Sequence, residues 1–239
     1  SVLYLFAIKF FYVASTELNL LLAISFLISV VGFIDDKYHL NIGGKLSLQI
    51  IPTSYLIIFG KIYLVSLGTY SNISLELNTF AVPFTILSIL FLINSFNYFD
   101  GIDGTLSLTT LSVILILFFL ISVEDNKLFL ITIVIPILIF LLFNFSLFNL
   151  PKLFLGDSGS LLIGFIISFK LIYFSNVENI HPILLAWSIS IFVIEFLAIN
   201  LIRIKNKTKL FKPNLDHLHH ILFQRTKSKT YTNIIIFFL

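Results

Sequence analysis

The stretch LFLITIVIPILIFLLFNFSLF, which covers residues 128–148, decides the fold class of this chain. It carries no charged residue, and its length meets the roughly 20 apolar residues that a helix needs to cross the hydrocarbon layer of a membrane. The apolar residues follow one another without the alternation that is typical of barrel strands. The stretch therefore predicts a transmembrane helix.

The composition of the whole chain extends this prediction beyond one segment. Of its 239 residues, 58% are hydrophobic and only 11% are charged, and the mean hydropathy is +1.05. Soluble domains carry about 25% charged residues. The composition therefore argues against a soluble enzyme, a disordered chain and a nucleic-acid-binding domain. The chain has no cysteine, so nothing points to disulfides, a thiol nucleophile or a cysteine metal site.

Further apolar segments predict an all-α fold, a polytopic transmembrane helical bundle. We find neither an internal repeat nor a soluble domain, so residues 1–239 are expected to form a single integral-membrane domain. The sequence predicts about nine spans, of which the first and last look truncated: 1–14, 18–34, 46–60, 80–96, 105–123, 128–148, 159–175, 181–204 and 230–239.

The loops between these spans fall into two sets that face opposite sides of the membrane. The set 35–45, 97–104, 149–158 and 205–229, with Arg203 at its border, holds eleven of the fifteen Lys and Arg residues. Cytoplasmic loops carry such an excess of positive charge. Six of the seven Asp residues also lie in this set. We expect a multi-pass protein of the plasma (inner) membrane whose catalytic loops face the cytoplasm.

Asp35 and Asp36 stand side by side at the cytoplasmic end of a predicted helix. Adjacent acids at a helix C-terminus repel each other and oppose the helix dipole. That cost suggests an offsetting cation such as Mg²⁺ or a lysine. The alternative is a solvated helix end with two paired acids.

The segment NSFNYFDGIDG, residues 94–104, contains two Asp-Gly pairs. Asp100 and Asp103 are each followed by Gly, which suits a tight turn whose backbone approaches a ligand, and Asn97 adds an amide. The spacing does not match an EF-hand loop. The alternative is an ordinary Asp-Gly turn between two helices.

The segment FLGDSGS, residues 154–160, precedes a helix predicted from residue 159. The free N–H groups of a helix N-terminus bind phosphate, and Asp157 is placed to hold a metal that bridges that phosphate. The plainer interpretation is that Asp157 or Ser158 caps the helix. The two interpretations are compatible.

His217, His219 and His220 lie within four residues and form a cationic or metal-binding cluster near neutral pH. Zinc prefers four tetrahedral ligands, and no cysteine is available here. The remaining candidates are Asp residues, which suit harder cations better. We therefore favour phosphate contact over zinc for these histidines.

The four motifs come from distant parts of the chain and converge on one predicted face. Mg²⁺ sites use one or two carboxylates together with substrate phosphates. Phosphoryl transfer depends mostly on positioning and on the stabilisation of charge. Several Asp residues, a helix N-terminus, Lys and His on one face therefore favour an enzyme that transfers a phosphoryl group.

The motifs resemble those of the polyprenyl-phosphate N-acetylhexosamine-1-phosphate transferases, the MraY/WecA-like superfamily of glycosyltransferase family 4. The family's Asp-Asp motif matches residues 35–36, and its N-x-x-N-x-x-D-G-x-D-G motif matches residues 94–104 at every defined position. Its F-x-G-D-x-G-S motif matches residues 154–160, and its H-x-H-H loop matches residues 217–220. Order and spacing agree across nearly the whole chain.

The resemblance implies a reaction in which a lipid phosphate attacks the β-phosphate of a UDP-sugar. The products are a polyprenyl-diphospho-sugar and UMP, and the reaction is the first membrane step of cell-surface glycan synthesis. The implied cofactor is Mg²⁺, with Mn²⁺ as an alternative. The partners are the UDP-sugar, the polyprenyl phosphate and the membrane, with no nucleic acid, and a homodimer is compatible with the sequence.

The resemblance also implies a role for each motif residue. Asp157 ligates the metal, with Asp100 as a second ligand. The carboxylate pair activates the lipid phosphate or sits near the metal, and Lys45 contacts phosphate. The implied roles of the remaining residues are as follows: Asn97, Asp100 and Asp103 line the nucleotide–metal site, Asp103 lies close to the uracil, Phe154 stacks on the uracil, and His217, His219 and His220 bind phosphate or sugar.

Several alternatives stay open. Leu218 interrupts the histidine run, which favours the UDP-N-acetylhexosamine branch over the phospho-MurNAc-pentapeptide translocase branch of peptidoglycan synthesis. Outside the family, an intramembrane aspartyl protease, a prenyltransferase or a transporter is a rival, but the acids lie in loops and only Glu195 and Lys170 lie deep. We expect Glu195 to face the bundle interior. The family's upstream basic motif is not found, so N-terminal and C-terminal helices are expected to be missing.

Overall fold

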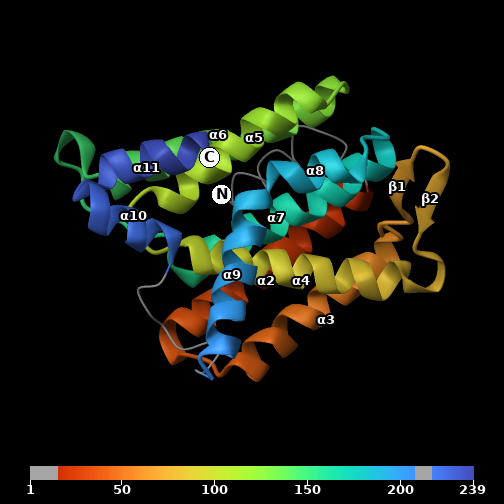
Figure 1. Ribbon diagram of the computed structural model, residues 1–239, viewed down its shortest axis with the longest axis horizontal. Helices are drawn as coiled ribbons and strands as arrows, with labels where there is room; N and C mark the ends of the chain where they lie inside the picture. Colours follow the sequence, from red (N-terminus) through yellow and green to blue (C-terminus); the bar gives the residue numbers. More distant parts are fainter. Residues whose placement is uncertain (1–15, 208–216) are drawn as a thin grey trace.

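The computed structural model describes residues 16–207 and 217–239, and they form a bundle of helices with one small sheet (Figure 1). The helices are α2 (Thr16–Tyr38), α3 (Ile42–Gly60), α4 (Ala81–Phe99), α5 (Thr105–Leu120), α6 (Glu124–Asn144), α7 (Gly156–Val177), α8 (Pro182–Ser188), α9 (Ser190–Lys205), α10 (Leu218–Thr226) and α11 (Lys229–Phe238). The strands are β1 (Ser66–Tyr70) and β2 (Ile73–Glu76), and the 3-10 turns are η1 (Asn78–Phe80) and η2 (Leu147–Asn149).

The predicted membrane class is confirmed, but the count of nine spans is not reached in the described part of the chain. Five helices are long and apolar enough to cross a membrane, namely α2, α3, α6, α7 and α4 together with η1. The predicted span 181–204 is instead the pair α8 and α9, bent by 71°, and it raises the count to six if taken as one span. The predicted span 105–123 is the shorter helix α5 of 16 residues, and the truncated span 230–239 is α11, which has 10 residues as predicted. The predicted span 1–14 lies outside the described residues.

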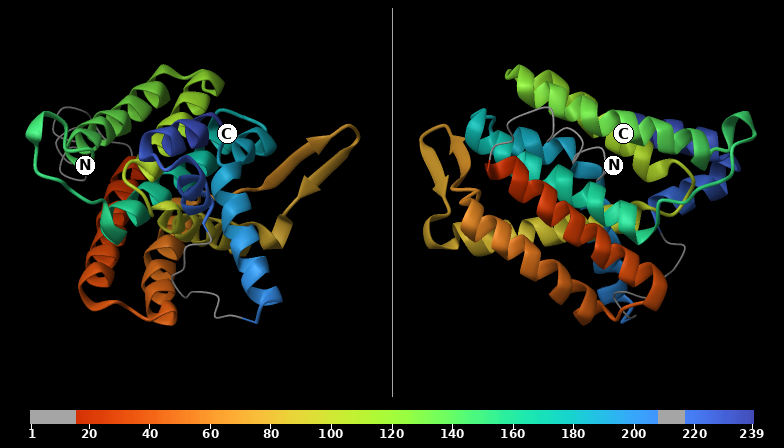
Figure 2. Two further views of the ribbon diagram at one scale, coloured as in Figure 1. Left: turned by 60° about the vertical axis from the view of Figure 1, so that its left-hand side comes forward. Right: turned by 180° about the vertical axis from the view of Figure 1, so that it is seen from behind.

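The helix α7 forms the centre of the bundle. In its most apolar 18-residue window 72% of residues are buried, whereas the other four long helices have 28–44%. Both α2 and α4 pack directly against α7, and α2 also packs against α3 (Figure 2). Two glycines permit this closeness. A Cβ on Gly32 would lie 2.6 Å from the carbonyl oxygen of Asp157, and one on Gly164 would lie 3.0 Å from the Cα of Ile93.

The predicted loop 61–79 contains a β-hairpin that the sequence analysis did not predict. The strands β1 and β2 pair antiparallel, with Ser66 opposite Glu76 and Tyr70 opposite Ile73. The hairpin projects from one end of the bundle, away from the turn between α2 and α3 (Figure 2). Glu178 lies at the hairpin end of α7 and accepts hydrogen bonds from the Ser122 and Val123 backbone at the start of α6.

Lys170, which the sequence places deep in a span, is held by aromatic rings. Its ammonium lies 3.9 Å from the ring centroid of Phe129 and 4.5 Å from that of Tyr173. Such contacts stabilise a cation that has little access to water. The position of Lys170 thus has a packing explanation that needs no transport pathway.

Candidate active site

The end of the bundle opposite the hairpin contains a cavity of about 440 Å³. Its walls come from the C-terminal end of α2, the start of α3, the end of α4, the end of α9 and the histidine segment. Of the predicted site residues, Asp35, Lys45, Asn97, Asp100, His217, His219 and His220 line it. Three of the four motifs therefore meet at this cavity, but its lining does not include Asp36, Asp103, Phe154 or Asp157.

The ammonium of Lys45 contacts side chains from three of the predicted motifs. Its ammonium lies 2.6 Å from Asp35 Oδ2, 3.0 Å from Asp157 Oδ2 and 3.0 Å from Asn97 Oδ1. The Asn97 side chain also donates to Asp157 Oδ1 at 2.7 Å and to Ser160 Oγ at 2.8 Å. The side chains of Lys45 and Asp35 are 14% and 8% exposed, so their charges have few water molecules to stabilise them. Each must be compensated by the other charges nearby.

Asp36 has a different position from its neighbour Asp35. Its two carboxylate oxygens accept hydrogen bonds from the backbone N–H groups of Asp157 at 2.8 Å and Ser158 at 3.1 Å. The helix α7 begins at Gly156 rather than at the predicted 159, and its own N-cap residue Leu155 makes no side-chain cap. The expectation that Asp157 or Ser158 caps the helix is therefore corrected, and two of the N–H groups expected to bind phosphate donate to Asp36. A carboxylate from α2 caps α7.

Asp100 follows α4 directly and lies at the wall of the cavity. The pKa of Asp100 is raised to about 7. Burial is the main cause, and the negative charges of Asp157, Asp36 and Asp103 add to it. The residue after Asp100 is Gly101, and its surroundings show why a glycine is needed there. A Cβ on Gly101 would overlap the ring of His219, so only glycine lets the histidine segment approach the turn this closely.

Asp103 lies outside the cavity lining, in a second cluster of charges. Its Oδ2 atom is 2.7 Å from the ammonium of Lys152 and 2.6 Å from that of Lys229. Burial opposes ionisation, but these hydrogen bonds and positive charges hold the pKa of Asp103 below its ordinary value. Phe154 belongs to this cluster, because the Lys152 ammonium lies 5.1 Å from its ring centroid. Phe154 is 73% exposed, so its ring is open to a planar ligand.

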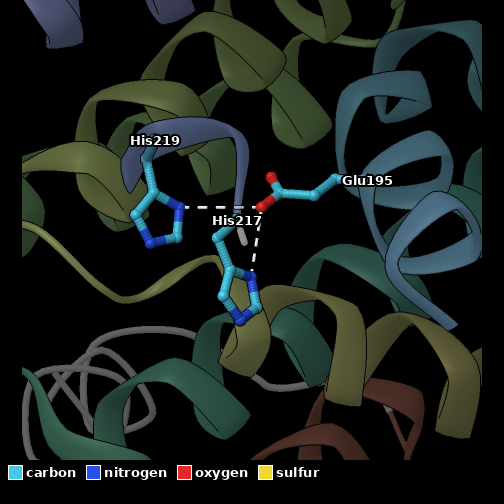
Figure 3. Close-up of side chains that lie close together, drawn as sticks. All are labelled: Glu195, His217 and His219. Atoms are coloured by element: carbon cyan, nitrogen blue, oxygen red, sulfur yellow. Dashed lines mark hydrogen bonds and ion pairs between the residues drawn. The ribbon is translucent and has the colours of Figure 1, made fainter. Parts of the chain in front are cut away.

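The histidine segment is anchored by Glu195 of α9, as expected of an acid that faces the bundle interior. Glu195 Oε1 lies 3.2 Å from His217 Nδ1 and 3.7 Å from His219 Nδ1, and it accepts a hydrogen bond from the Leu218 backbone at 3.1 Å (Figure 3). The side chains of Glu195, His217 and His219 are all buried. His220 is half-buried beside them. Burial, together with the His220 and His217 rings, lowers the pKa of His219 to about 3.

Three cavity residues were not predicted as site residues. Arg203, in the last turn of α9, is buried and lies 3.4 Å from the hydroxyl of Tyr98, and both residues line the cavity with His39. In the sequence Arg203 counted only as a positive charge at a loop border. The sequence offers no stronger signal, because a basic residue in the last turn of a helix at the cytoplasmic border is ordinary.

The oxygen donors at this end fit a hard divalent cation. Asp35, Asp157, Asn97 and Asp100 provide carboxylate and amide oxygens, the ligands that Mg²⁺ prefers. Burial raises the pKa of Asp100 most, and the charges of Asp157, Asp36 and Asp103 raise it further, so a dication here would meet several negative groups. Among the described residues, however, the predicted Asp ligands do not form a group of three with ligand atoms within 4.8 Å of one another.

Comparison with known proteins agrees with the resemblance. The profile of the family described as Glycosyl transferase family 4 matches residues 18–175. The undecaprenyl-phosphate alpha-N-acetylglucosaminyl 1-phosphate transferase of Escherichia coli (strain K12) is 27% identical over 213 residues, which cover 86% of this chain and 58% of that protein. The protein of that name from Yersinia pestis is 28% identical over 213 residues, with the same coverage.

A relative from a more distant bacterium gives the same result. The probable undecaprenyl-phosphate N-acetylglucosaminyl 1-phosphate transferase of Bacillus subtilis (strain 168) is 29% identical over 227 residues, or 90% of this chain and 61% of that protein. The chain thus spans about 60% of the length of these curated relatives. Since the family profile matches well over half of its residues, the chain belongs to glycosyl transferase family 4.

Proposed function

We propose that the protein transfers N-acetylglucosamine 1-phosphate from UDP-N-acetylglucosamine to a polyprenyl phosphate at the cytoplasmic face of the plasma membrane. An oxygen of the lipid phosphate forms a bond to the β-phosphorus, and the bond from that phosphorus to the bridging oxygen breaks. UMP leaves with the bridging oxygen, and the lipid diphospho-sugar remains in the membrane. The names of the curated relatives support the sugar and the lipid.

The observation that carries this proposal is the position of Lys45. One ammonium joins Asp35, Asn97 and Asp157, which come from three separate motifs, at the wall of a cavity large enough for a diphosphate. Both substrates are anions, so their approach requires positive charge at the point where they meet. Lys45 offsets the negative charge of Asp35 and Asp157 at this point, and Arg203 at the same cavity adds a second cation.

We assign a separate role to each of the other side chains at or near the cavity. Asp35 lies in the cavity, whereas Asp36 caps α7, so we assign to Asp35 the contact with the lipid phosphate and to Asp36 the positioning of Asp157. Asn97 holds the Asp157 carboxylate in one orientation through its amide. The uracil is expected near Phe154 and Asp103, where an exposed ring lies beside a charged cluster.

Mg²⁺, held by Asp157 and Asp100, would supply a positive charge for the two phosphates as charge shifts toward the leaving UMP. The protein's own contribution is to keep these oxygens in place before the substrates arrive. Asn97, Lys45 and the Asp36 cap do so through the contacts described above. Such preorganisation is the main source of catalysis in phosphoryl transfer.

The test is an assay of UMP release with purified protein in detergent. Polyprenyl phosphate, Mg²⁺ and either UDP-N-acetylglucosamine or UDP-N-acetylgalactosamine are supplied, with and without EDTA. We expect UMP only when lipid phosphate and metal are both present, and faster release with the glucosamine donor. Asp157→Asn should abolish UMP release, whereas Asp125→Asn, an exposed acid in the first turn of α6, should not change it. Equal release by both variants would contradict the assignment.

A further inference from the structure

We propose that Glu195, His217 and His219 form a binding site for one Zn²⁺ ion, separate from the aspartate site for Mg²⁺. With Glu195 as a third ligand, this proposal replaces the phosphate contact that the sequence favoured for His217 and His219. The site joins α9 to the first turn of α10 and fixes the histidine segment at the wall of the cavity. It is independent of the transfer reaction, because it rests on the geometry and chemistry of these three side chains alone.

The three side chains present their ligand atoms to one point. One ligand atom from each residue lies within 4.8 Å of the other two, and all three residues are buried. The Nδ1 atoms of both imidazoles face the same carboxylate, at 3.2 Å and 3.7 Å from Glu195 Oε1 (Figure 3). Ligands around a tetrahedral Zn²⁺, each about 2.0–2.2 Å from the metal, are separated by distances of this order.

The hydrogen bonds within the cluster leave buried polar atoms unsatisfied. Glu195 Oε2 and His219 Nδ1 are fully buried and have no hydrogen-bond partner, although His219 is 0% exposed. A buried polar atom without a partner costs about 1–3 kcal/mol, and more if the group is charged. A cation between the two imidazoles and the carboxylate satisfies both atoms at once.

The donor set selects a transition metal over Mg²⁺. Two of the three ligands are imidazole nitrogens, which suit Zn²⁺, whereas Mg²⁺ prefers oxygen atoms. His219 Nδ1 is buried and has no hydrogen-bond partner, so this nitrogen is available to a metal. Two His and one Glu leave the fourth position of a tetrahedral ion open for water or an anion.

Such a site would explain how a short helix is held in place. The helix α10 has nine residues, and its N-cap residue His217 makes no side-chain cap. Glu195 substitutes for the cap by accepting the Leu218 N–H. A metal bound to the same carboxylate would fix the His219 ring against Gly101, and with it the turn that carries Asp100.

Metal content tests the proposal without any need for activity. The intact protein, purified without chelator, is analysed for bound zinc and is then exchanged with Co²⁺, whose visible absorption reports tetrahedral coordination by nitrogen. We expect one zinc per chain and the strong absorption of tetrahedral Co²⁺. Glu195→Gln and His219→Ala should weaken metal binding by more than about 100-fold, because loss of even an outer partner costs 10–100-fold.

His181→Ala is the matched control, since His181 lies at the hairpin end, within 3.4 Å of the Thr69 carbonyl. This variant should retain the zinc and the Co²⁺ spectrum. Thermal unfolding shows that each variant is folded, and if Glu195→Gln does not fold, His219→Ala decides. A wild-type protein with no zinc and only a weak octahedral Co²⁺ spectrum would overturn the proposal in favour of a metal-free hydrogen-bonded triad. Undiminished binding by both variants would overturn it as well.

Discussion

Lys45 compensates two carboxylates that the fold brings together from α2 and α7. Asp35 and Asp157 are separated by more than a hundred positions in the sequence, yet both lie within 3.0 Å of its ammonium. Removing one partner of a buried ion pair costs ~3 kcal/mol or more, because the remaining charge is left without compensation. The ammonium therefore stabilises the site before any substrate binds.

We expect Lys45→Ala to lower the melting temperature and to abolish transfer. Without the ammonium, the two carboxylates attract a dication more strongly, so Mg²⁺ should raise the melting temperature of Lys45→Ala more than that of the wild type. Thermal unfolding with and without Mg²⁺ measures this. Lys61→Ala, at the far end of α3, should behave like the wild type. An equal Mg²⁺ effect in all three proteins would mean that Lys45 does not occupy the metal's surroundings.

The Asp103 cluster predicts a dependence of stability on pH. Because the pKa of Asp103 is held below its ordinary value of 3.8, its ion pairs with Lys152 and Lys229 stabilise the fold above that pH and are lost as the pH falls through the lowered value. Asp103→Asn should therefore melt below the wild type at pH 7, and the difference should shrink below pH 4. A difference that stays constant down to pH 3 would show that the charge of Asp103 is not its cause.

The sequence predicted that most of the candidate residues lie at one end of the bundle, but not which contacts each of them makes. Asp35 and Asp36 look equivalent in the chain, and only the start of α7 separates them, since it takes up the Asp36 carboxylate. Glu195 was expected inside the bundle, but its two histidine neighbours depend on a tertiary contact between α9 and α10. Spacing along the chain carries no information about such contacts.

The contact between α2 and α7 positions the site, because it carries Asp36 to the N-terminus of α7. Gly32 lies one turn before Asp36, and a Cβ there would press on the backbone of Asp157 and Ser158. Backbone atoms cannot move aside as a flexible side chain can. The two helices would have to move apart, and the Asp36 carboxylate would then leave the N-terminus of α7.

We expect Gly32→Ala to destabilise the protein by roughly 1–3 kcal/mol and to lower the rate of transfer. The loss of rate should be larger than that for Gly43→Ala, because a Cβ on Gly43 meets only the Asn41 side chain at an ordinary 3.7 Å. Chemical denaturation and the UMP assay on both variants measure the two effects. Wild-type rates in Gly32→Ala would show that the close helix contact does not set the position of Asp157.

Long apolar helices were predicted from hydropathy, whereas shorter elements were missed. The hairpin of β1 and β2 has a local signal that the prediction did not use, because apolar and polar residues alternate from Ile73 to Leu77. His181 beside Tyr70 also supports the hairpin from a distant segment. The bend between α8 and α9 interrupts a run that reads as one continuous span, and hydropathy alone does not reveal such a bend.

The bundle has two chemically distinct ends, and its orientation in the membrane can be measured directly. The chain has no cysteine, so a single introduced cysteine can be labelled alone. Asn72→Cys lies at the turn of the hairpin, and Gln224→Cys lies on α10 at the site end; both positions are exposed. We expect a membrane-impermeant maleimide to label Asn72→Cys in intact cells and Gln224→Cys only after permeabilisation. The reverse pattern would place the cavity outside the cytoplasm.

The central position of α7 has a consequence for how the protein is made. The helices α2 and α4 leave the ribosome first, but the surface against which both pack belongs to α7, which ends only at Val177. Until then, Asp35 and Lys45 lack the Asp157 carboxylate, and the apolar faces of α2 and α4 are left to lipid or to the insertion machinery. Synthesis therefore delivers the central helix only after two of the helices that pack on it, and the cavity closes only after the histidine segment has followed.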